Sequence, residues 1–213
     1  VATGDLLFSP AFAELAAVAD DPTARRQVQL LAAASVALAR GELAQRHDAF
    51  DTRITVERYA HRCKLKTAAL FECACTIGAT RPAAAEQALL AFGREIGLAF
   101  QILDDVLDVL GPPERTGKAR GTDLLDGTVT LPFILATERD PGLVDLDLRV
   151  LEVGEAAVVC DRIAATGAAE SAREDARARV ERAKATLAAA ADVTPQELEL
   201  LHLVADGVVE RYS

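Results

Sequence analysis

The stretch Phe100-Gln101-Ile102-Leu103-Asp104-Asp105-Val106-Leu107-Asp108 sets three carboxylates into an otherwise apolar segment. On an α-helix Asp104 and Asp108 lie one turn apart on one face, and Asp105 lies about 100° away, so all three can point toward one side. Apolar residues flank the acids on nearly every side, which is typical of a helix buried in a core. Buried carboxylates without partners are costly, so we expect these acids to meet metal ions or to line a wet cavity. Oxygen ligands on a rigid helix suit Mg²⁺, which keeps several waters and shares substrate phosphates.

The same D-D-x-x-D pattern on an exposed helix would be no more than a solvated acidic stripe. There, repulsion would cost only about 0.2–0.5 kcal/mol for each pair of like charges. The apolar neighbours of the three acids favour the buried interpretation.

Length and composition predict one helical domain over residues 1–213. Half of the residues are hydrophobic, which is enough to bury a single large core. The longest largely apolar run, 30–39, is about half of what a bilayer crossing requires, so we expect a core helix and no transmembrane segment.

Charge and cysteine usage exclude other classes of protein. The net charge of −10 argues against a nucleic-acid partner, because phosphate backbones are bound by concentrated Lys and Arg. The four cysteines form no C-x-x-C pair and no disulfide-rich pattern, which predicts small core residues in a reducing, cytoplasmic location.

The periodicity of apolar residues predicts a succession of helices and no convincing strand. Gly93 and Gly97 are one turn apart, so a neighbouring backbone can approach that face of their helix closely. Thr194-Pro195-Gln196-Glu197 is a capping box with proline at the first helical position. The expected helices span 8–19, 22–46, 55–78 and 82–110, and helices resume near 130 with boundaries near 141, 167 and 192.

Four further polar elements have both a functional and an ordinary interpretation. Glu42 and Gln45 share one face at the end of an apolar helix, where an ordinary helix end is the simpler explanation. Lys66, in an apolar helix, suits a visiting anion or a snorkelling side chain equally. The glycine-rich loop 117–123 could cover a phosphate, although such a loop alone is weak evidence, and 128–132 looks like a helix start.

Taken in order, these elements resemble the trans-isoprenyl diphosphate synthases, also called polyprenyl synthetases. The resemblance is dense from Gly4 to Pro132, and beyond about Asp140 it is only a helical pattern. It rests on G-E-x-x-Q at 41–45, K-T-A at 66–68, F-Q-x-x-D-D-x-x-D at 100–108 and G-K-x-x-G-x-D-L at 117–124.

The resemblance implies an all-α, isoprenoid-synthase-type bundle of packed helices around a central cavity, usually a homodimer. It also implies a reaction: an allylic diphosphate held by Mg²⁺ ionises, the double bond of isopentenyl diphosphate attacks the carbocation, and a proton is lost. The product is a longer trans-polyprenyl diphosphate.

The family also implies roles for individual residues. Asp104, Asp105 and Asp108 resemble the second aspartate-rich motif, whose metals neutralise the leaving diphosphate, with Asp104 and Asp108 preferred as direct ligands. Further residues of the expected catalytic and substrate-binding set are Lys66, Thr67, Phe100, Gln101, Lys118 and Asp123. Of these, Lys66 and Lys118 would hold the diphosphate, Thr67 and Gln101 would turn oxygen dipoles toward the cation, and Phe100 would border the isopentenyl pocket.

The sequence departs from the family pattern in two respects. The family has another D-D-x-x-D upstream, together with basic residues for isopentenyl diphosphate, and none of these is present; we expect the chain to lack that N-terminal third. Thr128 stands where the family usually has a lysine. The alternatives are a class I terpene cyclase, which adds no isopentenyl unit, and a non-catalytic partner subunit of a prenyl synthase.

Overall fold

Helices make up the architecture of the computed structural model, which describes residues 2–17, 22–79, 83–111, 119–190 and 192–210. No strand occurs within these ranges, so the all-α prediction is confirmed. The helices are α1 (Ala2–Ala17), α2 (Pro22–His47), α3 (Val56–Cys63), α4 (Ala69–Gly78), α5 (Ala83–Leu110), α7 (Thr122–Leu125), α8 (Leu131–Thr137), α9 (Val153–Ala165), α10 (Ala168–Ala188) and α11 (Pro195–Glu210). Short 3₁₀ turns span Pro141–Leu143 and Leu148–Val150.

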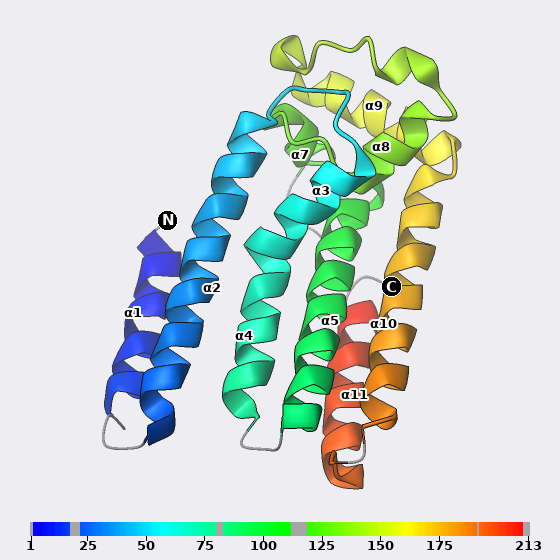
Figure 1. The fold of residues 1–213 in the computed structure, drawn as a ribbon. Coiled ribbons are helices and arrows are strands. Elements are labelled where there is room, and N and C mark those ends of the chain that lie inside the picture. Colours follow the sequence, from blue (N-terminus) through cyan, green and yellow to red (C-terminus); the bar gives the residue numbers. More distant parts are fainter. Residues whose placement is uncertain (1, 18–21, 80–82, 112–118, 191, 211–213) are drawn as a thin grey trace.

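Helices α2, α4, α5 and α10 run side by side, and helices α3, α7, α8 and α9 gather at one end of them (Figure 1). Helix α5 lies at the centre because its apolar residues encircle it, and it contributes more buried core residues than any other described helix. Its buried residues include Phe92, Ile96, Ala99, Ile102, Leu103, Val106 and Val109. Helix α10 packs along α5 through small residues, among them Ala172, Ala176, Val180 and Ala183. Arg179 and Arg182 of α10 form ion pairs with Glu95 of α5.

A π-helical turn, Lys64–Ala68, joins α3 to α4 and was not expected from the sequence. The turn is recognised by the hydrogen bond from the amide of Ala69 to the carbonyl of Lys64, five residues earlier. Two glycines permit close packing against this turn. A Cβ at Gly41 of α2 would lie 2.6 Å from the nitrogen of Lys66, and a Cβ at Gly97 of α5 would lie 2.6 Å from the Cα of Ala68. The close approach predicted for Gly97 is therefore confirmed.

Most predicted helix ends agree with the structure. The side chain of Thr55 caps α3 by accepting a hydrogen bond from the amide of Arg58, and α5 ends immediately before Gly111. Thr194 and Glu197 form the reciprocal hydrogen bonds of the predicted capping box. The first helix begins at Ala2 rather than Phe8 and continues through Pro10. Asp21, a residue type that favours helix caps and that precedes the expected helix at 22–46, lies outside the described residues.

Candidate functional site

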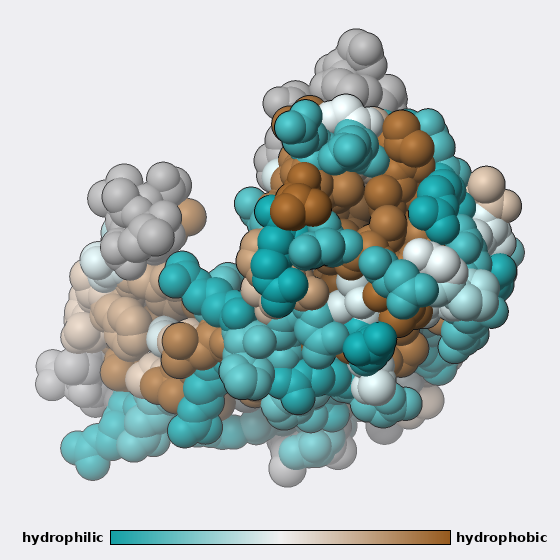
Figure 2. Space-filling model, turned by 90° about the horizontal axis from the view of Figure 1, so that it is seen from above, coloured by the Kyte–Doolittle hydropathy of each residue, from teal (hydrophilic) through white to brown (hydrophobic). Residues whose placement is uncertain are grey.

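A polar cavity of about 190 Å³ lies where α2, α3, the π-turn, α5 and α7 meet. It is at the end of the bundle that carries α3, α7, α8 and α9. Figure 2 shows the molecule from that side, with hydrophilic surface separating two areas where hydrophobic residues gather. The lining residues are Gln45, Tyr59, Arg62, Cys63, Lys66, Gln101, Asp104, Asp105, Asp123, Thr128 and Thr130.

Lys66 forms the cationic side of the cavity. The π-turn directs it toward the end of α2, where its Nζ lies 3.0 Å from Oε1 of Glu42 and donates to Oε1 of Gln45 at 3.2 Å. Nε2 of Gln45 in turn donates to the hydroxyl of Thr128 at 3.2 Å. The ordinary helix-end explanation for Glu42 and Gln45 was therefore wrong, because both hold the lysine of the cavity.

Asp104 and Asp105 project from adjacent positions of α5 but differ in environment. Asp104 is exposed and lines the cavity. Asp105 is only 2% exposed, and burial raises its pKa to about 7 although hydrogen bonds from Tyr59 and Gln101 oppose the shift. The hydroxyl of Tyr59 donates to Oδ2 of Asp105 at 2.5 Å, and Nε2 of Gln101 donates to Oδ1 at 2.9 Å.

Asp108 binds backbone amides at the start of α7. Its two carboxylate oxygens accept from the amides of Thr122 and Asp123 at 3.1 and 3.2 Å, where an acid is favoured by the exposed N–H groups. This bonding holds the side chain of Asp123 in the cavity lining. Burial, reinforced by the charges of Asp105, Asp108 and Asp104, raises the pKa of Asp123 to about 8.

The carboxylates suit a hard divalent cation in their chemistry. Asp104 and Asp123 line the cavity, and the mutual repulsion that raises the pKa of Asp123 would be relieved by positive charge. Within the described residues no three acidic, histidine or cysteine side chains are close enough to enclose a metal ion by themselves. The protein would thus supply part of a coordination shell that water and phosphate oxygens complete, as is usual for Mg²⁺.

The structure brings Lys66, Gln101, Asp104, Asp105 and Asp123 together in one cavity. Three other predicted site residues contact neighbours of the cavity or of its lining. Asp108 accepts a hydrogen bond from an amide at the start of α7, and Thr67 is hydrogen-bonded to Gln101 at 2.7 Å. Phe100 packs against Phe71, with ring centres 5.6 Å apart. Lys118 lies outside the described residues.

Sequence reasoning did not single out Tyr59 and Arg62, which both line the cavity. Arg62 is 3% exposed, donates to the carbonyl of Val129 and lies over the ring of Tyr59 at 5.4 Å. An arginine and a tyrosine inside a short amphipathic helix carry no spacing signal that marks them. Only the packing of α3 against α5 reveals that they reach the acids.

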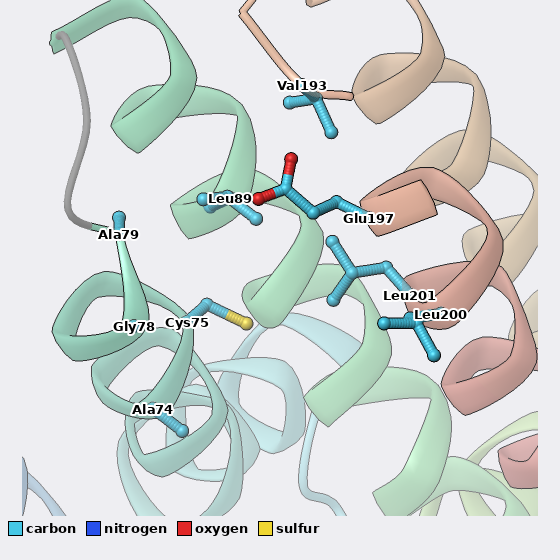
Figure 3. Close-up of a pocket in the computed structure, with 9 residues that line it drawn as sticks. All are labelled: Ala74, Cys75, Gly78, Ala79, Leu89, Val193, Glu197, Leu200 and Leu201. Atoms are coloured by element: carbon cyan, nitrogen blue, oxygen red, sulfur yellow. The ribbon is translucent and has the colours of Figure 1, made fainter. Parts of the chain in front are cut away.

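A second cavity, of about 410 Å³, lies between α4, α5 and α11 (Figure 3). Its lining is apolar apart from Glu197, whose carboxylate caps the start of α11 by accepting from Thr194. It includes none of the predicted site residues. The smaller polar cavity, where charges of both signs converge, is therefore the candidate site.

The all-α bundle and its acidic cavity define the class of fold, and comparisons with known proteins identify the family. Residues 1–150 match the family described as polyprenyl synthetase. The chain belongs to this family.

Individual relatives agree with this assignment. The chain is 32% identical to the geranylfarnesyl diphosphate synthase of Aeropyrum pernix, over 99% of this chain and 69% of that protein. It is 36% identical to heptaprenyl diphosphate synthase component 2 of Geobacillus stearothermophilus, over 79% of this chain and 53% of that protein.

Among solved structures, the polyprenyl synthase of Caulobacter crescentus CB15, complexed with calcium and isoprenyl diphosphate, superposes with a TM-score of 0.86. It shares 31% identity, and the match covers all of this chain and 66% of that one. The chain thus spans between about half and just over two thirds of the length of these relatives. In the described part of the chain, no helix combines the length and apolar character needed to span a bilayer.

Proposed function

We propose that the protein transfers prenyl groups: it condenses an allylic diphosphate with isopentenyl diphosphate to make a longer trans-polyprenyl diphosphate. The single observation that carries the proposal is the polar cavity, in which Lys66 and the carboxylates of Asp104 and Asp123 line the same space. A diphosphate with bound cations matches this pairing of charges. The family supports it, since the relatives named above are prenyl diphosphate synthases.

The residues have distinct tasks in this reaction. The carbon–oxygen bond of the allylic diphosphate breaks, the double bond of isopentenyl diphosphate attacks the resulting carbocation, and loss of a proton restores a double bond. Lys66 would hold the departing diphosphate, and Lys118 would assist it. When bound, Mg²⁺ would supply positive charge that stabilises the leaving group, with Asp104 as the first ligand and Asp105, Asp108 and Asp123 around it.

Gln101, Thr67 and Phe100 would act on the hydrocarbon part of the substrates. Gln101 and Thr67, which are hydrogen-bonded to each other, would supply neutral oxygen dipoles that face a carbocation. Phe100 would border the isopentenyl group. The apolar core behind α5 excludes water that would quench the cation. A homodimer in the cytoplasm is the expected setting.

The metal assignment is tested by calorimetry of pyrophosphate binding to the full-length protein. We expect tight binding only with Mg²⁺, and a loss of about 10²–10³ in affinity in Asp104→Asn, the scale of one preorganised electrostatic contact. The matched control is Asp175→Asn, which alters a part-buried ion pair with Arg179 within α10, outside the cavity lining. A pyrophosphate affinity that changes neither on removal of Mg²⁺ nor in Asp104→Asn would refute the assignment.

The reaction is tested with radiolabelled isopentenyl diphosphate and geranyl diphosphate. Label in a longer prenyl diphosphate supports the proposal. Release of pyrophosphate from geranyl diphosphate without incorporation of label would indicate a cyclase, and activity only in the presence of another protein would indicate a partner subunit. Heptaprenyl diphosphate synthase component 2 is by its name one part of such a synthase.

Lys66 has a specific prediction under this proposal. Lys66→Ala should raise KM for the allylic diphosphate more than KM for isopentenyl diphosphate, because the lysine would hold the leaving group. Lys184→Ala, which removes a lysine paired with Asp206 on α11, is the control. An equal rise in KM for both substrates would indicate that Lys66 has a purely structural role.

A further inference from the structure

Both oxygens of Asp105 are occupied by donors from within the protein. The hydroxyl of Tyr59 binds one oxygen and the side-chain amide of Gln101 binds the other. Because Asp105 is buried, these two bonds fix its carboxylate in one orientation. Asp104, the next residue, is by contrast exposed in the cavity lining.

This carboxylate determines which way the Gln101 amide points. The carboxylate oxygens of Asp105 accept hydrogen bonds from the hydroxyl of Tyr59 and from the nitrogen of Gln101, so the oxygen of Gln101 faces away from Asp105. That oxygen accepts the hydroxyl hydrogen of Thr67 at 2.7 Å. The hydroxyl hydrogen of Thr67 is therefore committed to Gln101, and the lone pairs of its oxygen are directed away from Gln101.

Tyr59 stands at the start of this chain of hydrogen bonds and is itself held rigidly. It is 2% exposed, and the guanidinium of Arg62 lies over its ring. Arg62 is held by the carbonyl of Val129, on the segment that leads into α8. Tyr59 comes from α3, Asp105 and Gln101 come from α5, and Thr67 comes from the π-turn. The series of hydrogen bonds therefore connects three elements around the cavity.

We infer that Tyr59 is a positioning residue for the proposed prenyl transfer: acting through Asp105 and Gln101, it directs the oxygen lone pairs of Thr67 outward to face positive charge. The inference rests on the proposed function. An oxygen dipole that is already oriented needs no reorganisation when a cation forms. Without the bond from Tyr59, Asp105 could turn, and the orientation of Gln101 and Thr67 would no longer be determined.

Kinetics of the full-length protein test this role through Tyr59→Phe, Asp105→Asn and the double variant. Each single change should lower kcat about 10–100-fold, the usual effect of removing an orienting hydrogen bond, with KM changed less than about threefold. Because Tyr59 acts through Asp105, the double variant should be no slower than the slower single variant. Thr76→Val is the matched control: it removes a buried hydroxyl that donates to the carbonyl of Glu72 on α4, and it should leave kcat unchanged.

A spectroscopic measurement follows the hydrogen bond itself. These 213 residues include no tryptophan and two tyrosines, so in this chain Tyr212→Phe leaves Tyr59 as the remaining tyrosine. Hydrogen bonding to a carboxylate quenches tyrosine emission, and Asp105→Asn in this background should therefore increase it. Unchanged emission would mean that the bond between Tyr59 and Asp105 does not exist in solution.

Three other outcomes would overturn the inference. If the losses from Tyr59→Phe and Asp105→Asn multiply, Tyr59 acts independently of Asp105. If Asp105→Asn weakens Mg²⁺-dependent pyrophosphate binding as much as Asp104→Asn, Asp105 is a metal ligand rather than an orienting group. If the wild type condenses its substrates and Tyr59→Phe has full kcat, only the positioning role fails; a wild type that neither binds pyrophosphate nor turns over refutes the proposed function as well.

Discussion

Replacing Gly97 by alanine tests whether the close contact between α5 and the π-turn is required. The new Cβ would lie 2.6 Å from the Cα of Ala68, against 3.4 Å where ordinary contact begins, a shortfall of 0.8 Å. Ala68 cannot yield by a side-chain rotation, because the opposing atom is backbone. The overpacking cost should therefore be near the upper end of the usual range, about 3 kcal/mol. A gain in helix propensity of about 1 kcal/mol offsets part of it, leaving a net loss of about 2 kcal/mol.

Urea denaturation followed by circular dichroism measures this loss of unfolding free energy. The matched control is Gly207→Ala in α11, where an added Cβ would meet nothing within 4 Å. That variant should gain about 0.5–1 kcal/mol from helix propensity alone. Equal stabilisation by both substitutions would refute the close approach. A displaced π-turn should also weaken Mg²⁺-dependent pyrophosphate binding in Gly97→Ala, because Lys66 lies on that turn.

Three further changes have defined outcomes. Thr194→Ala should lower the unfolding free energy by about 1 kcal/mol in the same denaturation assay, through loss of the α11 capping box; no loss would mean that the cap is dispensable. Asp48→Ala should lower the unfolding free energy by about 3–5 kcal/mol, because it leaves the buried Arg62 without its nearby carboxylate. The control Asp147→Ala, at an exposed ion pair, should lower it by only about 0–1 kcal/mol. Similar losses in the two variants would contradict this account. Burial raises the pKa of Cys63 to about 12, so iodoacetamide should modify it only after unfolding, as measured by mass spectrometry; rapid labelling of the native protein would show that α3 opens.

The sequence was informative wherever one residue type has one local consequence. Thr55 and Thr194 mark helix starts because their side chains satisfy free amides, and Gly111 marks the end of α5. The acids of α5 were recognisable because burying three carboxylates in an apolar helix is costly unless they have partners. These are interactions within a few residues of the chain, and a single sequence displays them directly.

Long-range contacts were beyond such reasoning. Glu42 and Gln45 looked like an ordinary helix end, and only the packing of α2 on the π-turn brings them to Lys66. The family resemblance favoured Asp108 as a direct metal ligand, yet a matching motif does not show that α7 places two amides against it. Its role as a ligand stays a prediction, as do those of the other site residues.

The π-turn also sets the rotational phase between α3 and α4. Tyr59 and Phe71 are 12 residues apart, so in an unbroken α-helix they would point about 120° away from each other. The extra residue of the turn removes about 100° of that difference, and both side chains meet α5, Tyr59 at Asp105 and Phe71 at Phe100. A chain shortened by one residue here could keep every helix and every polar side chain, and still turn Tyr59 away from its carboxylate. The length of this segment, as much as its composition, is therefore part of the information that builds the site.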